Sequence, residues 1–309
     1  MNRSAAFPAD PPFPPEAGRR PPVLPLPGAS AWGDDAYGLW IEMEIAGVGQ
    51  RFRWIEPGEF WMGSEDEAER YDDEGPRHGV RLTAGFWLAD TVCTQALWQA
   101  VTGENPSRFT DDPMNPVEQV SWDDVNAFLQ RVASSLPGVS PALPTEAEWE
   151  YACRAGSEGP FNLGATISPG QANYDGNHPY AGGEKGEFRG KTVPVKTFPP
   201  NAWGLYEMHG NVWEWCADGL REYDSASQVN PRGPEGDAPR VVRGGSWLYD
   251  AGRLRSASRN SWPRVYRLVY QGFRFSLWSN SQVAEQKQEQ EQEAGAERPP
   301  QGRGVARDA

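Results

Sequence analysis

The sequence of 309 residues is poor in the side chains that most enzymes use to bind metal ions or to attack a substrate. It has three histidines and three cysteines, and they form neither an HExxH nor a CxxC pattern. It also lacks a GxSxG nucleophile elbow, a GxGxxG turn after a strand, and a P-loop lysine. These absences argue against a zinc site, an α/β-hydrolase and the common nucleotide-binding enzymes.

Cysteine is too scarce for a disulfide framework. Cys93, Cys153 and Cys216 are an odd and sparse set, which favours a reducing compartment. The first 20 residues lack the apolar core of a signal peptide, and no stretch approaches 18 continuous apolar residues. We therefore expect a cytoplasmic protein without a membrane-spanning segment, although display at the cell surface by another route stays open.

Basic residues are in deficit. Lys and Arg number 29 against 43 Asp and Glu, which gives a formal net charge of −14. A protein that binds nucleic acid without sequence preference needs an excess of basic charge to displace counterions from the phosphates. General nucleic-acid binding is therefore not expected.

The two ends of the chain differ in composition from its middle. Nine prolines fall within the first 28 residues, which predicts an extended arm over residues 1–36. The other end, residues 279–309, is rich in Gln and Glu and has few apolar residues to bury, which predicts a solvated tail. Either end could also dock a partner. Between them we expect one globular domain over residues 37–278.

Hydrophobic periodicity and capping signals predict an α+β domain. Apolar and polar residues alternate over 39–45 and 51–55, and two further strands are expected at 59–63 and 79–82. Thr94, Ser121 and Thr145 are typical helix caps, and Thr145 begins a capping box with Glu148. We therefore predict helices over 94–101, from 121, and over 145–154. Gly- and Asn-rich loops with short strands are expected after residue 155.

Residues 243–275 differ from the rest of the chain. They contain seven arginines, one Asp and no Lys or Glu, so the local charge is about +6. Aromatic side chains are interleaved with the arginines, and Arg, Tyr and Trp are the residues that dominate binding hot spots. We expect Trp247 and Phe273, which lie next to glycines, to belong to the core. We expect ligand contact from Tyr249, Trp262, Tyr266 and Tyr270. Binding of an anion or a nucleic acid through the seven arginines is an alternative.

Six motifs in a fixed order indicate a family. They are EFWMGS at 59–64, NPV with VSW at 115–122, LPTEAEWE at 143–150, GLYEMHGNVWEW at 204–215, RGGSW at 243–247 and GFR at 272–274. Together they resemble the formylglycine-generating enzyme (sulfatase-modifying factor) family over nearly all of 37–278. The resemblance implies a C-type-lectin-like fold with a small antiparallel core, few helices and long ordered loops.

The resemblance also implies how activity can be judged. Catalytic members carry two cysteines after the RGGS motif, and these bind copper. The corresponding positions are Tyr249 and Leu254, neither of which can ligate copper as a thiolate. We therefore assign no catalytic residue and expect no formylglycine generation. The iron-dependent sulfoxide synthases of this family use histidines, which are too few here. A divergent metal-dependent oxidoreductase is the alternative.

Members of the family also bind calcium structurally. By motif, one site would use the carbonyls of Gly210 and Val212 and the carboxylate of Glu214, with Glu207 where relatives often have Asn. A second site would use Asn173 and the carbonyl of Tyr174, although its usual Asp is replaced near 186. Oxygen ligands of this kind suit Ca²⁺. No catalytic cofactor is expected.

A third branch of the family fits the chain best. Bacterial and phage diversity-generating retroelements use similar domains as variable proteins, in which adenine-directed mutagenesis varies chosen residues near the C-terminus. We thus predict a non-catalytic protein that binds an unidentified protein or other macromolecule. The candidate variable positions are Leu248, Tyr249, Asp250, Arg253, Ser258, Ser261, Trp262, Arg264, Val265, Tyr266, Leu268, Val269, Tyr270 and Gln271.

Overall fold

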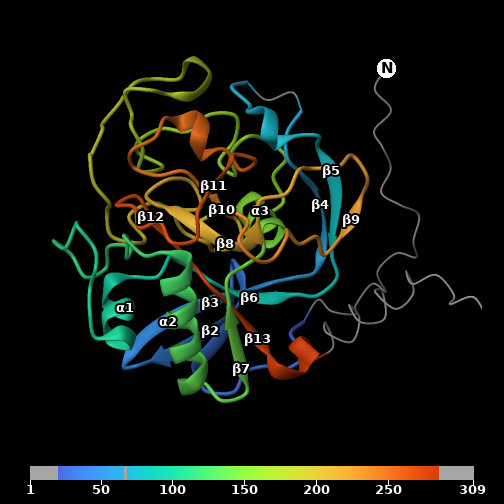
Figure 1. Cartoon of the computed structure of the whole chain (residues 1–309), viewed down its shortest axis with the longest axis vertical. Helices are drawn as coiled ribbons and strands as arrows, with labels where there is room; N and C mark the ends of the chain where they lie inside the picture. The colour runs from blue at the N-terminus through green and yellow to red at the C-terminus, as the bar shows by residue number, and fades with distance from the viewer. Residues whose placement is uncertain (1–19, 66–67, 285–309) are drawn as a thin grey trace, which may run out of the picture.

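The computed structural model describes residues 20–65 and 68–284. Three sheets organise them (Figure 1). A six-stranded sheet with the helices α1 and α2 forms one end of the molecule, and two smaller sheets with most of the long loops form the other. The fold is α+β and dominated by short strands and loops, as predicted.

The six-stranded sheet joins the beginning and the end of the domain. Its order is β1-β2-β3-β6-β13-β7, and every neighbouring pair is antiparallel. The last strand, β13, lies between β6 and β7, so the chain end is locked into the sheet's interior. The strands are β1 (Ala29–Asp35), β2 (Gly38–Ile45), β3 (Val48–Ile55), β6 (Phe86–Ala89), β7 (Val139–Ala142) and β13 (Ser276–Ser279).

The predicted helices form, with the predicted caps. They are α1 (Gln95–Thr102), α2 (Trp122–Ser135) and α3 (Glu146–Arg154). Thr94 caps α1, and complete capping boxes at Ser121 and Thr145 begin α2 and α3. Trp98 of α1 stacks on Phe128 of α2 with ring centroids 5.1 Å apart, which joins the two helices over the sheet. All nine residues of α3 are buried.

A four-stranded sheet carries the motifs of the C-terminal half. Its order is β11-β10-β8-β12, and β12 runs parallel to β8. The strands are β8 (Trp213–Gly219), β10 (Arg240–Arg243), β11 (Arg259–Trp262) and β12 (Gln271–Gly272). Because side chains alternate along a strand, Trp213 and Trp215 of β8 lie on one face, and Glu214 lies on the face toward α3. Figure 1 shows α3 beside this sheet.

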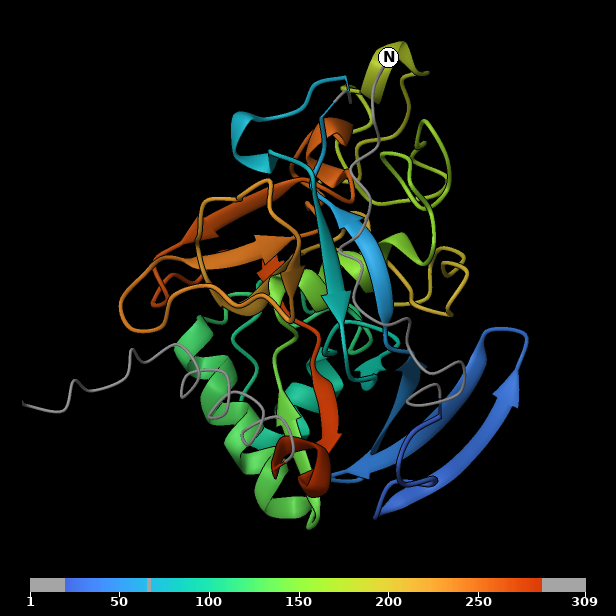
Figure 2. The same cartoon turned by 90° about the vertical axis from the view of Figure 1, so that its right-hand side faces the viewer.

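The third sheet and the loops complete the domain. Strands β4 (Gly58–Met62), β5 (His78–Leu82) and β9 (Gln228–Val229) form the third sheet, in that order. Figure 2 shows β4 and β5 running beside the four-stranded sheet. Three short 3₁₀ turns follow the chain at η1 (Asp72–Glu74), η2 (Tyr180–Gly182) and η3 (Ala251–Leu254). Residues 155–212, all of which are described, contain neither an α-helix nor a named strand. This agrees with the loops predicted there.

The structure corrects both predicted domain boundaries. Residues 29–35, assigned to the arm, form β1 and pair with β2, and Leu26 is buried in the core. At the other end Gln282 is buried and its amide donates to the Gly85 carbonyl over 2.9 Å. The packed domain thus extends past 37–278 on both sides, because the flanking residues find sheet edges and core surface to cover. The rest of the predicted arm and tail lies in 1–19 and 285–309, outside the described residues. No helix among the described residues is long and apolar enough to cross a membrane.

Candidate binding surface

Four of the seven arginines in the segment 243–275 are buried inside the protein. Arg243, Arg255, Arg259 and Arg274 are each at most 1% exposed, and each contacts a buried glutamate. The glutamates are Glu150, Glu74, Glu146 and Glu214, respectively. They come from α3, η1 and β8, so the pairs join the segment to three distant parts of the chain.

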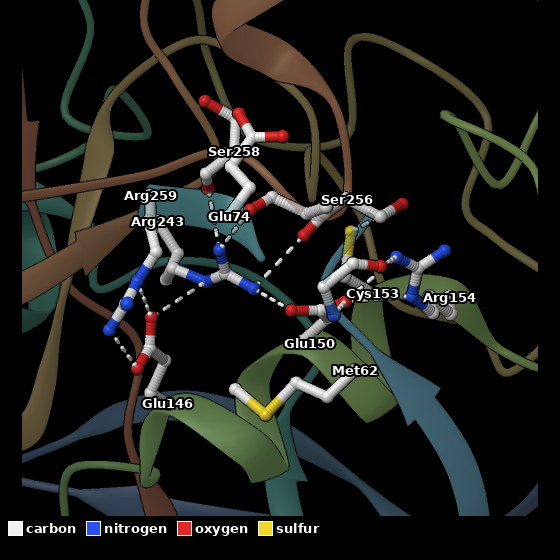
Figure 3. Close-up of polar contacts among 12 residues, drawn as sticks. Met62, Glu74, Glu146, Glu150, Cys153, Arg154, Arg243, Ser256, Ser258 and Arg259 are labelled. Carbon is white, nitrogen blue, oxygen red and sulfur yellow. Dashed lines mark hydrogen bonds and ion pairs between the residues drawn. The ribbon is translucent and has the colours of Figure 1, made fainter. Parts of the chain in front are cut away.

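The pairs have the geometry of strong, charge-assisted hydrogen bonds. Arg255 donates to both oxygens of Glu74 over 2.6 Å, and Arg259 donates to both oxygens of Glu146 over 2.8 and 2.7 Å. Figure 3 shows the guanidinium of Arg243 between Glu146 and Glu150. It also donates to the carbonyls of residues 256, 257 and 258 over 2.7–3.1 Å. Buried charges persist only when they are paired and hydrogen-bonded in this way.

Electrostatics agree with this geometry at Glu150. Burial alone raises the pKa of the Glu150 carboxyl, but the adjacent guanidinium groups of Arg154 and Arg243 outweigh burial and hold that pKa below its ordinary value. The Nε of Arg154 donates to Glu150 over 2.9 Å. Glu150 is therefore a charged residue shared between two arginines, inside the protein.

The structure argues against the alternative in which the seven arginines bind an anion or a nucleic acid. Besides the four buried arginines, Arg267 forms a two-point ion pair with Asp124, both bonds 2.7 Å long, and Arg264 lies near Asp123. Arg253 stacks on Tyr71, with its guanidinium carbon 3.4 Å from the ring centroid. Acidic residues from elsewhere in the chain thus balance the local charge of +6, which leaves little free positive charge for an anion or a nucleic acid.

The fourteen candidate variable positions divide by burial. Ser258 and Gln271 are fully buried, so they cannot contact a ligand at the surface, and these two predictions are wrong. Ser258 lies directly before β11, and Gln271 is the first residue of β12. The other twelve are exposed or half-exposed, and we call them the variable-segment surface: Leu248, Tyr249, Asp250, Arg253, Ser261, Trp262, Arg264, Val265, Tyr266, Leu268, Val269 and Tyr270.

Four aromatic rings meet in a closed cycle at this surface. Trp213 contacts Tyr249 (5.7 Å between centroids) and Trp262 (5.8 Å), and Tyr270 contacts the same two rings (5.6 and 5.9 Å). All four contacts are edge-to-face, the arrangement that aromatic pairs prefer. Trp213 is buried, whereas the other three rings are half-exposed. We call this group the aromatic quartet. Burial, together with a hydrogen bond to Tyr270, raises the pKa of the Tyr249 hydroxyl above its ordinary value.

A wide, shallow depression of about 690 Å³ lies beside the quartet. Leu248, Tyr249 and Asp250 line one side of it, and Glu69, Asp175 and His178 belong to its other walls. Tyr249 therefore borders both the quartet and the depression. Of the charged residues along its walls, three are acidic and one, Lys185, is basic, so the depression is acidic like the chain as a whole.

Comparison with known proteins identifies the family. The model of the sulfatase-modifying factor enzyme 1-like domain matches residues 46–277. The chain is 36% identical over 234 residues to the formylglycine-generating enzyme of Thermomonospora curvata, which covers 69% of this chain and 74% of that protein. The chain belongs to the formylglycine-generating enzyme family.

Other relatives show that the family contains more than one kind of protein. A bovine relative named inactive C-alpha-formylglycine-generating enzyme 2 is 34% identical over 166 residues, which is 53% of this chain and 47% of that one. Among solved structures, Treponema denticola variable protein 1 superposes with a TM-score of 0.65 at 26% identity. That match covers 77% of this chain and 98% of the variable protein. Family membership alone therefore does not decide whether this chain is an enzyme.

The cysteines of this family member are not placed for thiolate chemistry. All three are buried and free. Burial raises the pKa of the Cys153 thiol to about 12, and it raises the pKa values of Cys93 and Cys216 far above the ordinary range. His209 lies 3.9 Å from the sulfur of Cys153, but burial lowers the pKa of that imidazole to about 4. Cys93 lies directly before the cap of α1, and Cys153 lies within α3. Leu254, where catalytic relatives carry a cysteine, is fully buried.

At the first of the two expected calcium sites, the Glu214 carboxylate is bound by side chains of the protein. Both carboxylate oxygens of Glu214 accept hydrogen bonds from Arg274, over 2.6 and 2.8 Å, and one also accepts from the indole of Trp149 over 2.8 Å. The Gly210 carbonyl accepts the Val212 amide. The guanidinium group of Arg274 therefore already binds the carboxylate of Glu214. No group of three or more His, Cys, Asp or Glu in the described part of the chain could hold a metal ion.

Glu207 and Asn173, which also belong to the expected calcium sites, have hydrogen-bond partners of a different kind from those of Glu214. The Glu207 carboxyl accepts the backbone amides of Lys196 (3.1 Å) and Phe198 (3.3 Å), and burial raises its pKa to about 7. At the second expected site, the side chain of Asn173 is fully buried. Its amide nitrogen donates to the Lys191 carbonyl and to Asn211, but its oxygen has no hydrogen-bond partner among the described residues.

Sequence reasoning missed the partners of the buried arginines. Glu74, Glu146 and Glu150 were not singled out from the sequence, and Glu148 was named only as part of a capping box. The available signal was that three glutamates follow one another at alternate positions in EAEWE, where Ala147 and Trp149 also had to be buried. A short helix with both sets of positions buried must pair its charges inside the protein.

Proposed function

We propose that this chain is a non-catalytic ligand-binding protein and that its partner docks on the variable-segment surface. The observation that carries the proposal is the division within 243–275 between a buried, ion-paired framework and an outward layer of aromatic and apolar residues. Leu248, Val265 and Tyr266 are 43%, 58% and 48% exposed. Large exposed side chains on rigidly held loops are typical of binding surfaces, where Tyr and Trp provide contact area at low entropic cost.

The finer part of the proposal is that a diversity-generating retroelement varies this surface. Two findings support it. The chain superposes on Treponema denticola variable protein 1 across 98% of that protein. The residues that hold the framework lie outside the proposed variable set, so that the surface can change while the arginine–glutamate pairs remain. The raised thiol pKa values support the absence of formylglycine-generating activity.

The test requires only the DNA around the gene. We expect a reverse transcriptase gene nearby and a near-repeat of the codons for 243–275 that differs from them only at adenines. The codons for Arg243, Arg255, Arg259 and Arg274 should match the repeat. Adenine differences at those four codons would contradict the proposal, since varying them would break the buried pairs.

A binding experiment tests the surface itself. Alanine substitutions of Tyr249, Trp262, Tyr266 and Tyr270 should each weaken binding of a partner at least tenfold without changing the folded structure. The matched control is Trp32→Ala, because Trp32 is 53% exposed but lies on β1 of the six-stranded sheet. Equal losses for Trp32→Ala and the four surface variants would argue against this surface, as would turnover of a thiol substrate by protein that carries a redox metal.

A structural calcium ion at Asn173 and the carbonyl of Tyr174 is a separate, smaller proposal. It is supported by the buried Asn173 amide oxygen, which has no other partner in the part of the chain that the structure describes. Carbonyl and amide oxygens are ligands that Ca²⁺ uses. Addition of calcium should raise the midpoint of thermal unfolding of the wild type and leave that of Asn173→Ala unchanged. A wild-type midpoint that does not respond to calcium would remove the proposal.

A further inference from the structure

Gln271 is buried without hydrogen-bond partners for its side chain. It lies on β12 and is 0% exposed. Neither the oxygen nor the nitrogen of its amide has a partner within residues 20–65 and 68–284. A buried amide without partners destabilises a protein, and native structures seldom keep one without a reason. The side chain therefore needs an explanation other than packing.

A second unpartnered group lies beside it. Gln271 pairs with Trp213 of β8 in parallel register, so their side chains emerge on the same face of the sheet. Trp213 is also 0% exposed, and its indole N–H has no hydrogen-bond acceptor in the described part of the chain. Trp213 is the buried member of the aromatic quartet. An unpartnered indole N–H thus belongs to the aromatic quartet, whose other three rings are half-exposed, and an unpartnered amide lies on the neighbouring strand.

We propose that Gln271 and Trp213 form the polar floor of a subsite that takes the carboxamide of an Asn or Gln side chain from a protein partner. This inference rests on the proposed function, because it assigns a ligand group to the same surface. Gln271 offers one acceptor and two donors, and Trp213 adds a donor. A carboxamide has the complementary acceptor and donors, so it can form paired N–H···O bonds with Gln271 while its oxygen also accepts from Trp213.

The charges around the floor favour a neutral ligand group. The nearest ionised residue in sequence on β8, Glu214, lies on the opposite face and is bound by Arg274. An ammonium or carboxylate entering between the rings would lose its hydration without meeting a counter-charge. The rim of exposed Leu248, Val265 and Tyr266 suits the apolar surface of a protein more than it suits a sugar chain.

Access to the floor requires that a ring moves. Tyr249 contacts the buried ring of Trp213 with centroids 5.7 Å apart, and it contacts Tyr270, the residue before Gln271, with centroids 5.6 Å apart. Tyr249 also borders the open depression of about 690 Å³, which gives its ring space to turn into. Under this proposal, Tyr249 rotates toward the depression, its edge-to-face contacts with Trp213 and Tyr270 break, and a path to Gln271 opens.

The test uses the full chain with ¹⁵N-labelled tryptophan and three small probes: propionamide, propionate and propylammonium. The Trp213 indole signal, assigned by its loss in Trp213→Phe, should shift saturably with propionamide in the millimolar range and should not shift with the two charged probes. N-acetylglucosamine is a fourth probe. A shift with that sugar alone would overturn the assignment to a protein side chain. If none of the four probes shifts the signal, the subsite is wrong.

The decisive variant is Gln271→Met, which keeps the shape of the side chain and removes its amide. It should weaken the propionamide response at least tenfold and raise the midpoint of thermal unfolding by about 2–4 °C, since a buried unsatisfied amide is lost. The matched control is Ser258→Ala, because the Ser258 hydroxyl is also buried without a partner but lies outside the quartet. It should leave the propionamide response unchanged.

The outcomes separate this inference from the proposed function. If Gln271→Met lowers stability and leaves the propionamide response intact, Gln271 is structural and the subsite is wrong. If Tyr249→Ala abolishes binding of a partner while Gln271→Met leaves it unchanged, the surface binds as proposed and only the subsite falls. If neither Tyr249→Ala nor Gln271→Met affects binding of a partner, the proposed function is wrong as well.

Discussion

The four buried arginines of the segment 243–275 serve the fold. A guanidinium provides five donors in a rigid fork, so one arginine can bind a carboxylate and several backbone carbonyls at once. Arg243 does this with Glu150 and three carbonyls of residues 256–258, and Arg255 does it with Glu74 and the Glu69 carbonyl. Loops without regular hydrogen bonding are therefore held in place by side chains.

Breaking one buried pair should be costly. Glu74→Gln leaves Arg255 buried with an uncompensated charge, and loss of one partner of such a pair typically costs about 3–5 kcal/mol of stability. Urea unfolding of the variant and the wild type measures the difference. The control is Glu59→Gln, because Glu59 pairs with Arg81 near the surface, where a pair contributes at most about 1 kcal/mol. Similar losses for the two variants would show that the buried pair is not special.

Glu207 should make stability depend on pH. Its pKa is raised from 4.5 to about 7 by burial, so the folded state keeps a proton that the unfolded state has already released. Stability contributed by the neutral carboxyl is therefore full below about pH 4.5 and is lost as the pH rises to about 7. The loss is on the order of 1–3 kcal/mol. In Glu207→Gln this slope between pH 4.5 and 7 should disappear, as measured by denaturant unfolding at several pH values. An unchanged slope would assign it to another group.

Helices of this chain were predictable because their signals are local. A capping box needs only two residues three positions apart, and Ser121 with Asp124 and Thr145 with Glu148 both form it. Strands such as β13 and β6 were not predicted, since residues 276–279 pair with residues 86–89 and 139–142 far away in the sequence. Their burial on both faces also removes the alternation of polar and apolar residues that marks a strand.

Asp124 joins the start of α2 to the segment 243–275. Its loss should therefore remove both the helix cap and the ion pair with that segment. Its carboxylate completes the capping box with Ser121 and binds Arg267 at two points. Asp124→Ala should cost about 1–2 kcal/mol, most of it from the lost cap. Arg267→Ala removes only the half-exposed ion pair and should cost less than about 1 kcal/mol. Thermal unfolding of the two variants compares them, and a larger loss for Arg267→Ala would contradict this division.

The molecule as a whole separates a buried, ion-paired interior from an exposed layer of aromatic and apolar side chains. Motif residues such as those of RGGSW could be assigned to the scaffold from sequence, and Trp247 and Phe273 are buried as predicted. The charge balance of the surface could not be predicted, because it depends on which distant glutamates reach each arginine. For the same reason Gln271 was assigned to the surface, although its short strand pairs with β8 and its side chain is fully buried.

This separation predicts that the surface tolerates simultaneous change. Replacement of Leu248, Val265, Tyr266 and Leu268 together by Ser should change the free energy of unfolding by less than about 2 kcal/mol, since exposed substitutions are usually within about 0.5 kcal/mol each. The single substitution Glu74→Gln, one pair beneath that surface, should cost more than the four together. Urea unfolding of both proteins makes the comparison. If the fourfold variant is the less stable, the outward side chains are part of the core, and the segment could not vary without loss of the fold.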